Sequence, residues 1–281
     1  MKRVLILLIL VFQLFLSASG VNANGVETIN VGLVVAEDIT SNEDGLIIID
    51  GLFSISTFEK FPAVDDFKIY TRWIGSGKQV IKVQILDEED NIVMDSDSVA
   101  LEFDKDYSTY YQYFDFNNIV FTKPGIYRIQ ALIDNKVARE IPLFIEASEE
   151  ELEFENASKL PALILSCPAD SVTEKENNLQ VISGVFEYFT SKRFPFAYDF
   201  IIANVWHSGD GEYSQYIELI DPDGKIIYSS EPQSFAQGPK TVNVIYDKLE
   251  DIIFFKAGTY RVRVYLDDKV VSDYPVLVVP R

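Results

Sequence analysis

The chain contains one histidine and one cysteine, which limits the acid, base and nucleophilic chemistry available to it. Such catalysis usually depends on a histidine, and His207 is the only one in the sequence. We expect His207 to be a surface or strand-end residue, the alternative being a catalytic or ligand role. We interpret Cys167, in the apolar run 163–167, as a small buried hydrophobe, the alternatives being a reactive thiol or an intermolecular bridge. The sequence therefore predicts no catalytic residue, no metal site and no cofactor.

Carboxylates are abundant, with 44 Asp and Glu against 24 Lys and Arg and a formal net charge of −20. Two carboxylates can hydrolyse a glycoside, so a carboxylate-dependent secreted hydrolase is one alternative function, although abundance singles out no pair. Residues 221–224, Asp-Pro-Asp-Gly, have the composition of a tight turn, and calcium binding is the alternative for them and for residues 87–90. The acidic charge repels nucleic acid and anionic membranes, so neither is an expected partner.

Residues 107–116 concentrate six aromatic side chains in ten positions. If this segment is a strand, both of its faces are aromatic, and one set can be exposed. Exposed tyrosines form stiff, amphipathic contacts at interfaces and on sugar-binding platforms. Packing in the core or between domains is the alternative, because aromatic residues also favour strands. The candidate binding residues, for an unknown protein or glycan partner, are Tyr107, Tyr110, Tyr111 and Tyr113.

The elements that carry these residues occur twice, because a shift of 133 residues lays one half of the chain over the other. The register slips by one residue only at the central turn, where Asp87 meets Asp221. The matches include Gly51-Leu52-Phe53 with Gly184-Val185-Phe186, Phe61-Pro62 with Phe194-Pro195, Trp73 with Trp206, residues 123–128 with 256–261, Asp134 with Asp267, and Pro142 with Pro275.

Within each copy, short runs alternate apolar and polar residues, which predicts strands that expose one face to water. In residues 67–73 the odd positions carry the apolar face, and residues 260–266 and 270–279 are expected to form a hairpin. Tyr127 and Tyr260 stand where a tyrosine corner is found, and Trp73 and Trp206 suit a core position. The fold class predicted is all-β, with two tandem immunoglobulin-like antiparallel β-sandwich domains.

The beginning of the chain has the layout of a secretory signal peptide, predicted over residues 1–23. Its apolar run, residues 4–16, is shorter than the ~20 residues that cross a bilayer, and an uncleaved anchor is the alternative. The remaining segments are domain 1 (24–146), an acidic linker (147–159) and domain 2 (160–281). We expect an extracytoplasmic protein, secreted or in the cell envelope, that contacts membrane only through the signal peptide before cleavage.

The second copy resembles a group of uncharacterised bacterial domains. Four segments carry the resemblance: residues 183–186, 193–195, 221–224 and 257–260. It extends from about Pro161 to Val279 and more loosely over the first copy, which departs from the pattern at residues 87–91. Members of that group are mostly short, single-domain proteins of unknown function. The resemblance implies a sandwich fold and a bacterial origin, and assigns no functional residue.

Together these patterns favour a non-catalytic exported protein that serves as a binding or structural module. A carbohydrate-binding accessory protein that uses residues 107–116 is the first alternative, and the secreted hydrolase is the second.

Overall fold

The computed structural model describes residues 20–21, 27–149 and 160–281, and these residues form strands and no helix. The all-β prediction is therefore confirmed. Residues 1–19 and 22–23 of the predicted signal peptide and residues 150–159 of the predicted linker lie outside the described part. We refer to residues 27–147 as domain 1 and to residues 162–280 as domain 2.

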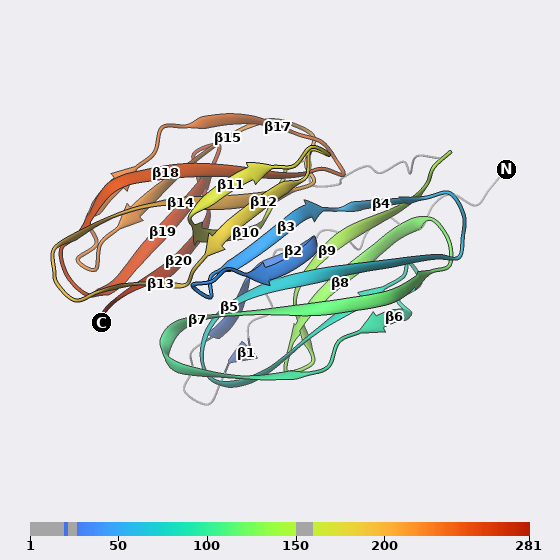
Figure 1. Ribbon diagram of the computed structural model, residues 1–281, viewed down its shortest axis with the longest axis horizontal. Coiled ribbons are helices and arrows are strands. Elements are labelled where there is room, and N and C mark those ends of the chain that lie inside the picture. Colours follow the sequence, from blue (N-terminus) through green and yellow to red (C-terminus); the bar gives the residue numbers. More distant parts are fainter. Residues whose placement is uncertain (1–19, 22–26, 150–159) are drawn as a thin grey trace.

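Domain 1 contains eight strands, and a two-residue strand β1 (Gly20–Val21) pairs with the first of them. Domain 2 repeats the plan in more and shorter pieces (Figure 1). The strands of domain 1 are β2 (Glu27–Ser41), β3 (Ile47–Phe53), β4 (Ile55–Phe58), β5 (Ala63–Leu86), β6 (Ile92–Asp95), β7 (Val99–Phe121), β8 (Gly125–Ile133) and β9 (Lys136–Ala147). Those of domain 2 are β10 (Ala162–Ala169), β11 (Ser171–Glu174), β12 (Gln180–Val185), β13 (Tyr188–Ser191), β14 (Phe196–His207), β15 (Gly211–Ile220), β16 (Ile226–Ser229), β17 (Gln233–Gln237), β18 (Val242–Phe254), β19 (Gly258–Leu266) and β20 (Lys269–Pro280).

Each domain packs an inner sheet, which faces the other domain, on an outer sheet. The inner sheet of domain 1 has the order β3-β2-β5-β7, and the long strand β5 continues into the outer sheet, where it pairs with β8. In domain 2 the inner sheet is formed by β10, β14 and β18, and the outer sheet has the order β13-β20-β19-β15-β16.

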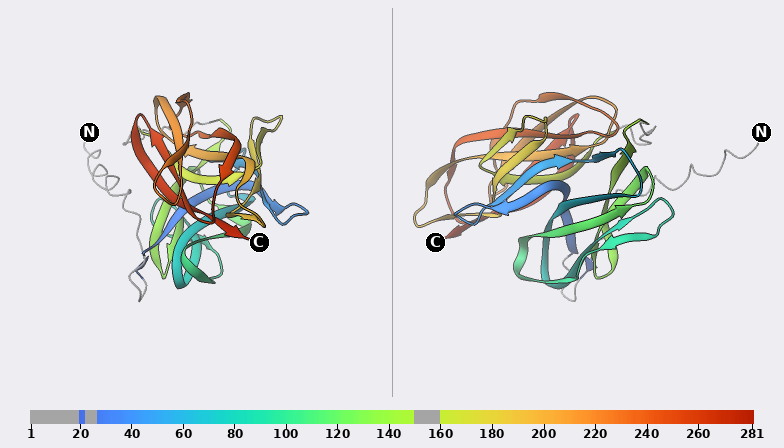
Figure 2. Two further views of the ribbon diagram at one scale, coloured as in Figure 1. Left: turned by 90° about the vertical axis from the view of Figure 1, so that its left-hand side faces the viewer. Right: turned by 45° about the vertical axis from the view of Figure 1, so that its right-hand side comes forward.

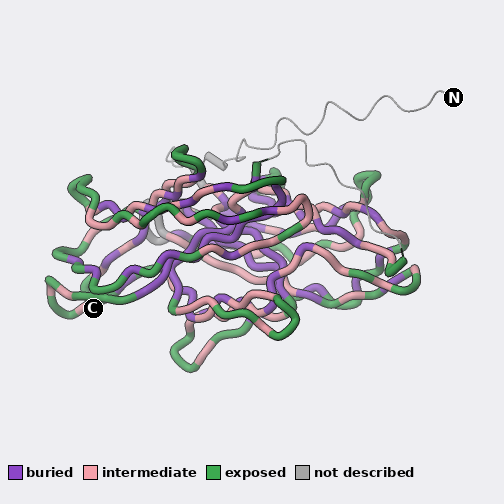
Figure 3. Tube along the Cα trace, turned by 90° about the horizontal axis from the view of Figure 1, so that it is seen from above, coloured by how far each residue is buried: buried purple, intermediate pink, exposed green. Residues whose placement is uncertain are grey.

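The central strands of the inner sheets, β5 and β14, contain runs buried on both faces, which corrects the prediction of strands that expose one face. Strands such as β18 and β19 alternate buried with partly or fully exposed residues, as predicted. In β5, Phe67 and Trp73 enter the core of domain 1, whereas Tyr70 and Arg72, on the opposite face, are covered by domain 2. The strands at the centre of the molecule are accordingly buried, and exposed residues gather in the peripheral loops (Figure 3). Alternation along a single strand cannot reveal this, because the second face is covered by residues more than 90 positions away.

The two inner sheets are also joined through their edges. Strand β3 pairs antiparallel with β12, and a single bridge joins Gly32 of β2 to Leu165 of β10. Views from two further sides show β2 and β3 beside the strands at the start of domain 2 (Figure 2). The domains therefore form one continuous structure.

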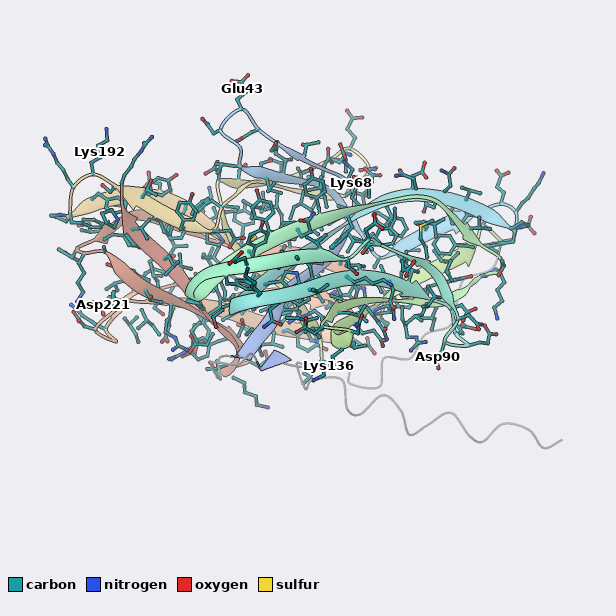
Figure 4. The ribbon with its side chains drawn as sticks, turned by 90° about the horizontal axis from the view of Figure 1, so that it is seen from below. Glu43, Lys68, Asp90, Lys136, Lys192 and Asp221 are labelled. Atoms are coloured by element: carbon teal, nitrogen blue, oxygen red, sulfur yellow. The ribbon has the colours of Figure 1, made fainter. Side chains whose placement is uncertain are left out.

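The turns follow the chemistry that the sequence indicates. Asp221 accepts hydrogen bonds from the backbone N–H groups of Asp223 and Lys225, both at 2.9 Å, and Gly224 has φ +84°. The turn at 87–90 is built in the same way, from Asp87. Asp90 and Asp221 lie at opposite ends of the molecule (Figure 4).

The two tyrosines predicted to form corners bond back to the chain four residues upstream. The hydroxyl of Tyr127 donates to the carbonyl of Lys123 at 3.0 Å, and that of Tyr260 donates to the carbonyl of Lys256 at 3.1 Å. Each side chain therefore ties the start of its strand, β8 or β19, to the preceding loop. This geometry agrees with the tyrosine-corner interpretation.

Candidate binding surface

The predicted binding tyrosines all lie on β7, but they do not share one environment. The side chain of Tyr107 lies outside the described residues. Tyr110 is exposed, at 42%, with its ring edge-on to Phe103, and Tyr111 and Tyr113 are half-buried. The strand thus presents one exposed ring and two partly covered ones.

Tyr111 and Tyr113 belong to the face of β7 that is directed toward domain 2. The ring of Tyr111 stacks on that of Tyr70, with centroids 6.1 Å apart, and the ammonium of Lys68 lies 5.7 Å from the centroid of Tyr113. Lys68 also contacts the carboxylates of Asp38 and Asp115. Both packing and exposure therefore contribute here, and the two interpretations of residues 107–116 each describe part of the cluster.

A fully buried ion pair between the domains lies beneath these tyrosines. Arg72, the cross-strand partner of Tyr111, places Nε 3.0 Å and Nη2 2.9 Å from Oε2 of Glu187 in domain 2. Its Nη1 donates to the carbonyl of Ser166 at 2.8 Å, and its guanidinium lies over the ring of Tyr274, 4.9 Å from the centroid. Arg72 therefore reaches into domain 2 and is held there by three kinds of contact.

The environment shifts the pKa of both members of the pair. Burial favours the neutral form of Arg72, but the adjacent Glu187 carboxylate outweighs it and holds the pKa of the guanidinium above its usual value. Burial raises the pKa of Glu187, and Arg72 opposes that shift. Removing either partner would leave the other charge in a site that excludes water.

Domain 2 contributes a further tyrosine that the sequence reasoning missed. Tyr188 directly follows Glu187, is 58% exposed, and interacts electrostatically with Tyr111, whose pKa is raised chiefly by burial. Its counterpart in the first copy is Ile55, so the repeat gave no signal for it. We call Tyr111, Tyr113 and Tyr188 the tyrosine surface, which crosses the seam between the domains. Tyr110 pairs with Trp73 and lies on the opposite face of β7, so it is not part of this surface.

His207 ends β14, as one part of the prediction stated, but it is not on the surface. It is buried against domain 1, where its ring stacks on Phe144 at a centroid distance of 6.3 Å. Burial lowers the pKa of His207 to about 4. Its Nδ1 lies 2.6 Å from Oγ of Ser208. The ring therefore contributes to the packing between the domains.

Cys167 is fully buried in β10, as its apolar surroundings predicted. Burial raises the pKa of its thiol to about 12, so the thiol stays protonated and unreactive at neutral pH.

Asp247 on β18 is the other buried carboxylate that stands out. It accepts hydrogen bonds from Gln233 at 2.7 Å and Gln215 at 3.2 Å, and Gln215 in turn accepts one from the indole N–H of Trp206 at 2.6 Å. Burial raises the pKa of Asp247. A shallow, open depression of about 410 Å³ lies above this network, lined by Gln233, Val244, Ile245, Tyr246 and Lys248.

Carboxylates of the two acidic turns form ion pairs with basic side chains nearby. Lys256 contacts the carboxylate of Asp223 at 2.6 Å, and Arg128 contacts that of Asp90. Across the described ranges, His, Cys, Asp and Glu side chains form no group of three that could hold a metal ion. These contacts support the turn interpretation of both segments.

The fold defines the class of the protein as an all-β chain made of two copies of one domain. A family model described as a family of unknown function (DUF6941) matches residues 32–146 and, a second time, residues 164–279. The chain therefore belongs to this family, of which it carries two tandem members. No curated protein matches it by sequence.

Similarity to solved structures is weak. A domain titled as the BSP domain of a biofilm-associated protein aligns with 8% identity and a TM-score of 0.21, covering 82% of this chain and 30% of that one. A transglutaminase of red sea bream aligns with 8% identity and a TM-score of 0.23, covering 80% and 30%. The chain thus spans about a third of the length of either structure.

Proposed function

We propose that this protein is a non-catalytic, exported binding module whose contact site is the tyrosine surface. The observation that carries the proposal is that the half-buried Tyr111 of domain 1 and the exposed Tyr188 of domain 2 meet at one seam, above the buried pair of Arg72 and Glu187. Large, stiff aromatic side chains give extensive contact with little loss of conformational entropy. The ion pair fixes the two halves of the surface relative to each other, which lowers the cost of binding.

The chemistry around the rings suits a partner with both polar and apolar groups. Lys68 and Asp115 border Tyr113 on the same face of β7. The strongly negative chain selects against acidic partners and favours neutral or basic ones. A protein surface and a glycan both meet these requirements.

Glycan binding is the second candidate, because exposed tyrosine rings beside polar side chains can stack on sugar rings. Glycan arrays and affinity gels should be run on the wild type and on a Tyr111→Ala, Tyr188→Ala double variant. Tyr246→Ala removes a partly exposed tyrosine elsewhere on domain 2 and serves as the control. Retardation by a glycan that only the double variant loses supports this candidate, and no retardation of the wild type by any glycan removes it.

For a protein partner, the same three proteins should be used as bait against the secreted and envelope fractions of the source cells. We expect the wild type and Tyr246→Ala to retain the same partner and the double variant to lose it. Equal retention by all three would place the contact site elsewhere.

Export is part of the proposal and rests on the amino-terminal sequence. Within the described part of the chain, no helix is long and apolar enough to cross a membrane. Cell fractionation with amino-terminal sequencing tests it, and we expect an extracytoplasmic protein that begins at Asn24. A protein that remains in the cytoplasm with Met1 intact would contradict it.

A hydrolase is not favoured. The two strongly buried carboxylates among the described residues are held by structural partners, Glu187 by Arg72 and Asp247 by two glutamines.

A further inference from the structure

Equivalent residues of the two domains lie opposite each other where the domains meet. Gly32 pairs with Leu165 and Ile49 pairs with Ile182, and in both pairs the residue numbers differ by 133, the offset of the repeat. An interface in which equivalent positions meet is that of a two-fold symmetric dimer. The domains therefore use nearly the same surface to bind each other.

The charges in this interface break the symmetry. The position equivalent to Arg72 is Val205, and the position equivalent to Glu187 is Ser54, so the ion pair exists in one half of the interface only. In the other half, the Ser54 hydroxyl donates to the carbonyl of Lys240.

A second ion pair is equally one-sided. The ammonium of Lys175 lies 2.7 Å from Glu37 and 2.9 Å from Asp50, both in domain 1. The residue equivalent to Lys175 in domain 1 is Asn42, which instead caps its own turn through the N–H groups of Asp44 and Leu46.

Shape breaks the symmetry at the central bridge. A Cβ atom added at Gly32 would lie 2.6 Å from Cδ1 of Leu165, far inside van der Waals contact. The leucine of domain 2 therefore fits because its equivalent in domain 1 has no side chain. Two leucines could not meet in this place, and two glycines would leave a void.

These differences act against pairing between identical domains. Two copies of domain 1 would bury Arg72 against Ser54, and two copies of domain 2 would bury Glu187 against Val205 and oppose two Leu165 side chains. A buried charge without its partner is strongly destabilising, so each alternative carries a penalty that the observed pairing avoids.

We propose that this interface is a recognition surface specific for domain 1 against domain 2, with Arg72, Glu187, Gly32 and Leu165 as its determinants. The partner that this surface fits is a second copy of this chain. When domains 1 and 2 of one chain are not paired with each other, domain 1 of one copy docks on domain 2 of the other through the same contacts. The near-symmetric geometry argues for this partner, because an exchanged dimer repeats the existing interface twice without new contacts.

Charge reversal in the full chain tests the proposal. We expect the Arg72→Glu and Glu187→Arg chains, each expressed alone, to lose most of their soluble, folded yield. Co-expressed with different affinity tags, they should purify together as a 1:1 dimer, because exchange restores an opposite-charge pair in both interfaces. A merely structural role of either residue would not allow rescue by the other chain.

The exposed pair of Lys78 and Glu102 provides the control, since reversing either member should leave yield unchanged and produce no tag exchange. The neutral chain Arg72→Val, Glu187→Ser tests the determinants independently, and it should melt well above either single change. Co-expressed single variants that never purify together overturn the second-copy partner. A neutral double variant no more stable than the single ones overturns the specificity.

Discussion

Strand β7 of domain 1 and strand β18 of domain 2 occupy equivalent places, yet they carry different chemistry. Phe114 of β7 pairs with Ile69 in an apolar core, whereas Asp247 of β18 pairs with Ile202 and is held by two glutamines. On the other face, Tyr111 of β7 corresponds to Val244 of β18. The backbone pairing is the same in both copies, so the side chains on these strands can diverge while the scaffold is kept.

The two buried tryptophans also differ in the acceptor that satisfies the indole N–H group. The indole N–H of Trp73 donates to Thr71, two residues away on the same strand, at 3.0 Å. That of Trp206 donates to Gln215 on a different strand. Domain 1 therefore satisfies its tryptophan locally, while domain 2 depends on a network that includes a buried carboxylate.

The largest expected effect comes from giving domain 1 the residue of domain 2 at the buried ion pair. Arg72→Val leaves Glu187 buried without a partner, and we expect it to lower the free energy of unfolding by about 3 to 5 kcal/mol. Equilibrium urea denaturation measures the change. Arg261→Val is the matched control, because Arg261 is 54% exposed and its pair with Asp273 contributes about 1 kcal/mol or less. Equal losses in both variants would show that burial of the pair does not matter.

Gln215→Ile gives domain 2 the residue found at the equivalent place in domain 1, because Gln215 pairs with Leu266 as Ile81 pairs with Ile133. It removes the acceptor of Trp206 and a donor to Asp247, and we expect a loss of about 2 to 4 kcal/mol. Thr71→Val removes the acceptor of Trp73 and should cost about 1 to 3 kcal/mol, since no buried carboxylate depends on it. Thermal and urea unfolding of both variants decide the order. A larger loss for Thr71→Val would contradict the comparison.

His207→Ile, which copies Ile74 of domain 1, tests the pH dependence that domain 2 alone carries. Because burial lowers the pKa of His207 to about 4 from 6.5, the folded protein binds fewer protons than the unfolded one between these values. The contribution of His207 to the free energy of unfolding is therefore fully present above pH 6.5. It is lost as the pH drops toward 4, by about 3 kcal/mol at most.

Urea denaturation at several pH values should show this slope in the wild type and a flatter curve in His207→Ile. Glu187 and Asp247 have raised pKa values and contribute the opposite slope in both proteins, so the difference between the two curves isolates His207. Parallel curves would mean that the histidine does not titrate as its burial requires.

The smallest effect on stability is expected at the tyrosine surface. Tyr188→Ser removes an exposed ring, so it should change the free energy of unfolding by no more than about 0.5 kcal/mol. Partner or glycan retention should nevertheless fall. Tyr111→Ser is the informative contrast, because the loss of its stacking on Tyr70 should reduce stability measurably.

Features that depend on residues within one copy could be predicted from the sequence. Alternating residues, the offset of 133 and the Gly-x-Tyr positions predicted the strands, the two copies and the tyrosine hydrogen bonds. The acidic turns were also predicted, because Asp and Gly act on their own local backbone.

Contacts between the two domains could not be predicted from the sequence. Arg72 looked like a solvated residue on the polar side of β5, and its partner Glu187 lies 115 positions further along the chain. For the same reason His207 was expected at the surface, and Tyr188 was not recognised. Pairing across an interface leaves no periodicity in either strand, so these residues could be found only once the two domains were seen together.

The pairing of β3 with β12 has a consequence for how the chain is made. Residues 46–49 are a run of leucine and isoleucine, and an uncovered edge strand of this composition is a template for aggregation. In the finished protein, β12 covers that edge. Domain 1 is synthesised first, and the ribosome needs on the order of ten seconds to complete domain 2 at the usual rate of ~5 to 20 residues per second. Until domain 2 is complete, β12 cannot cover the edge of β3, so domain 1 is most open to aggregation through that edge in this interval.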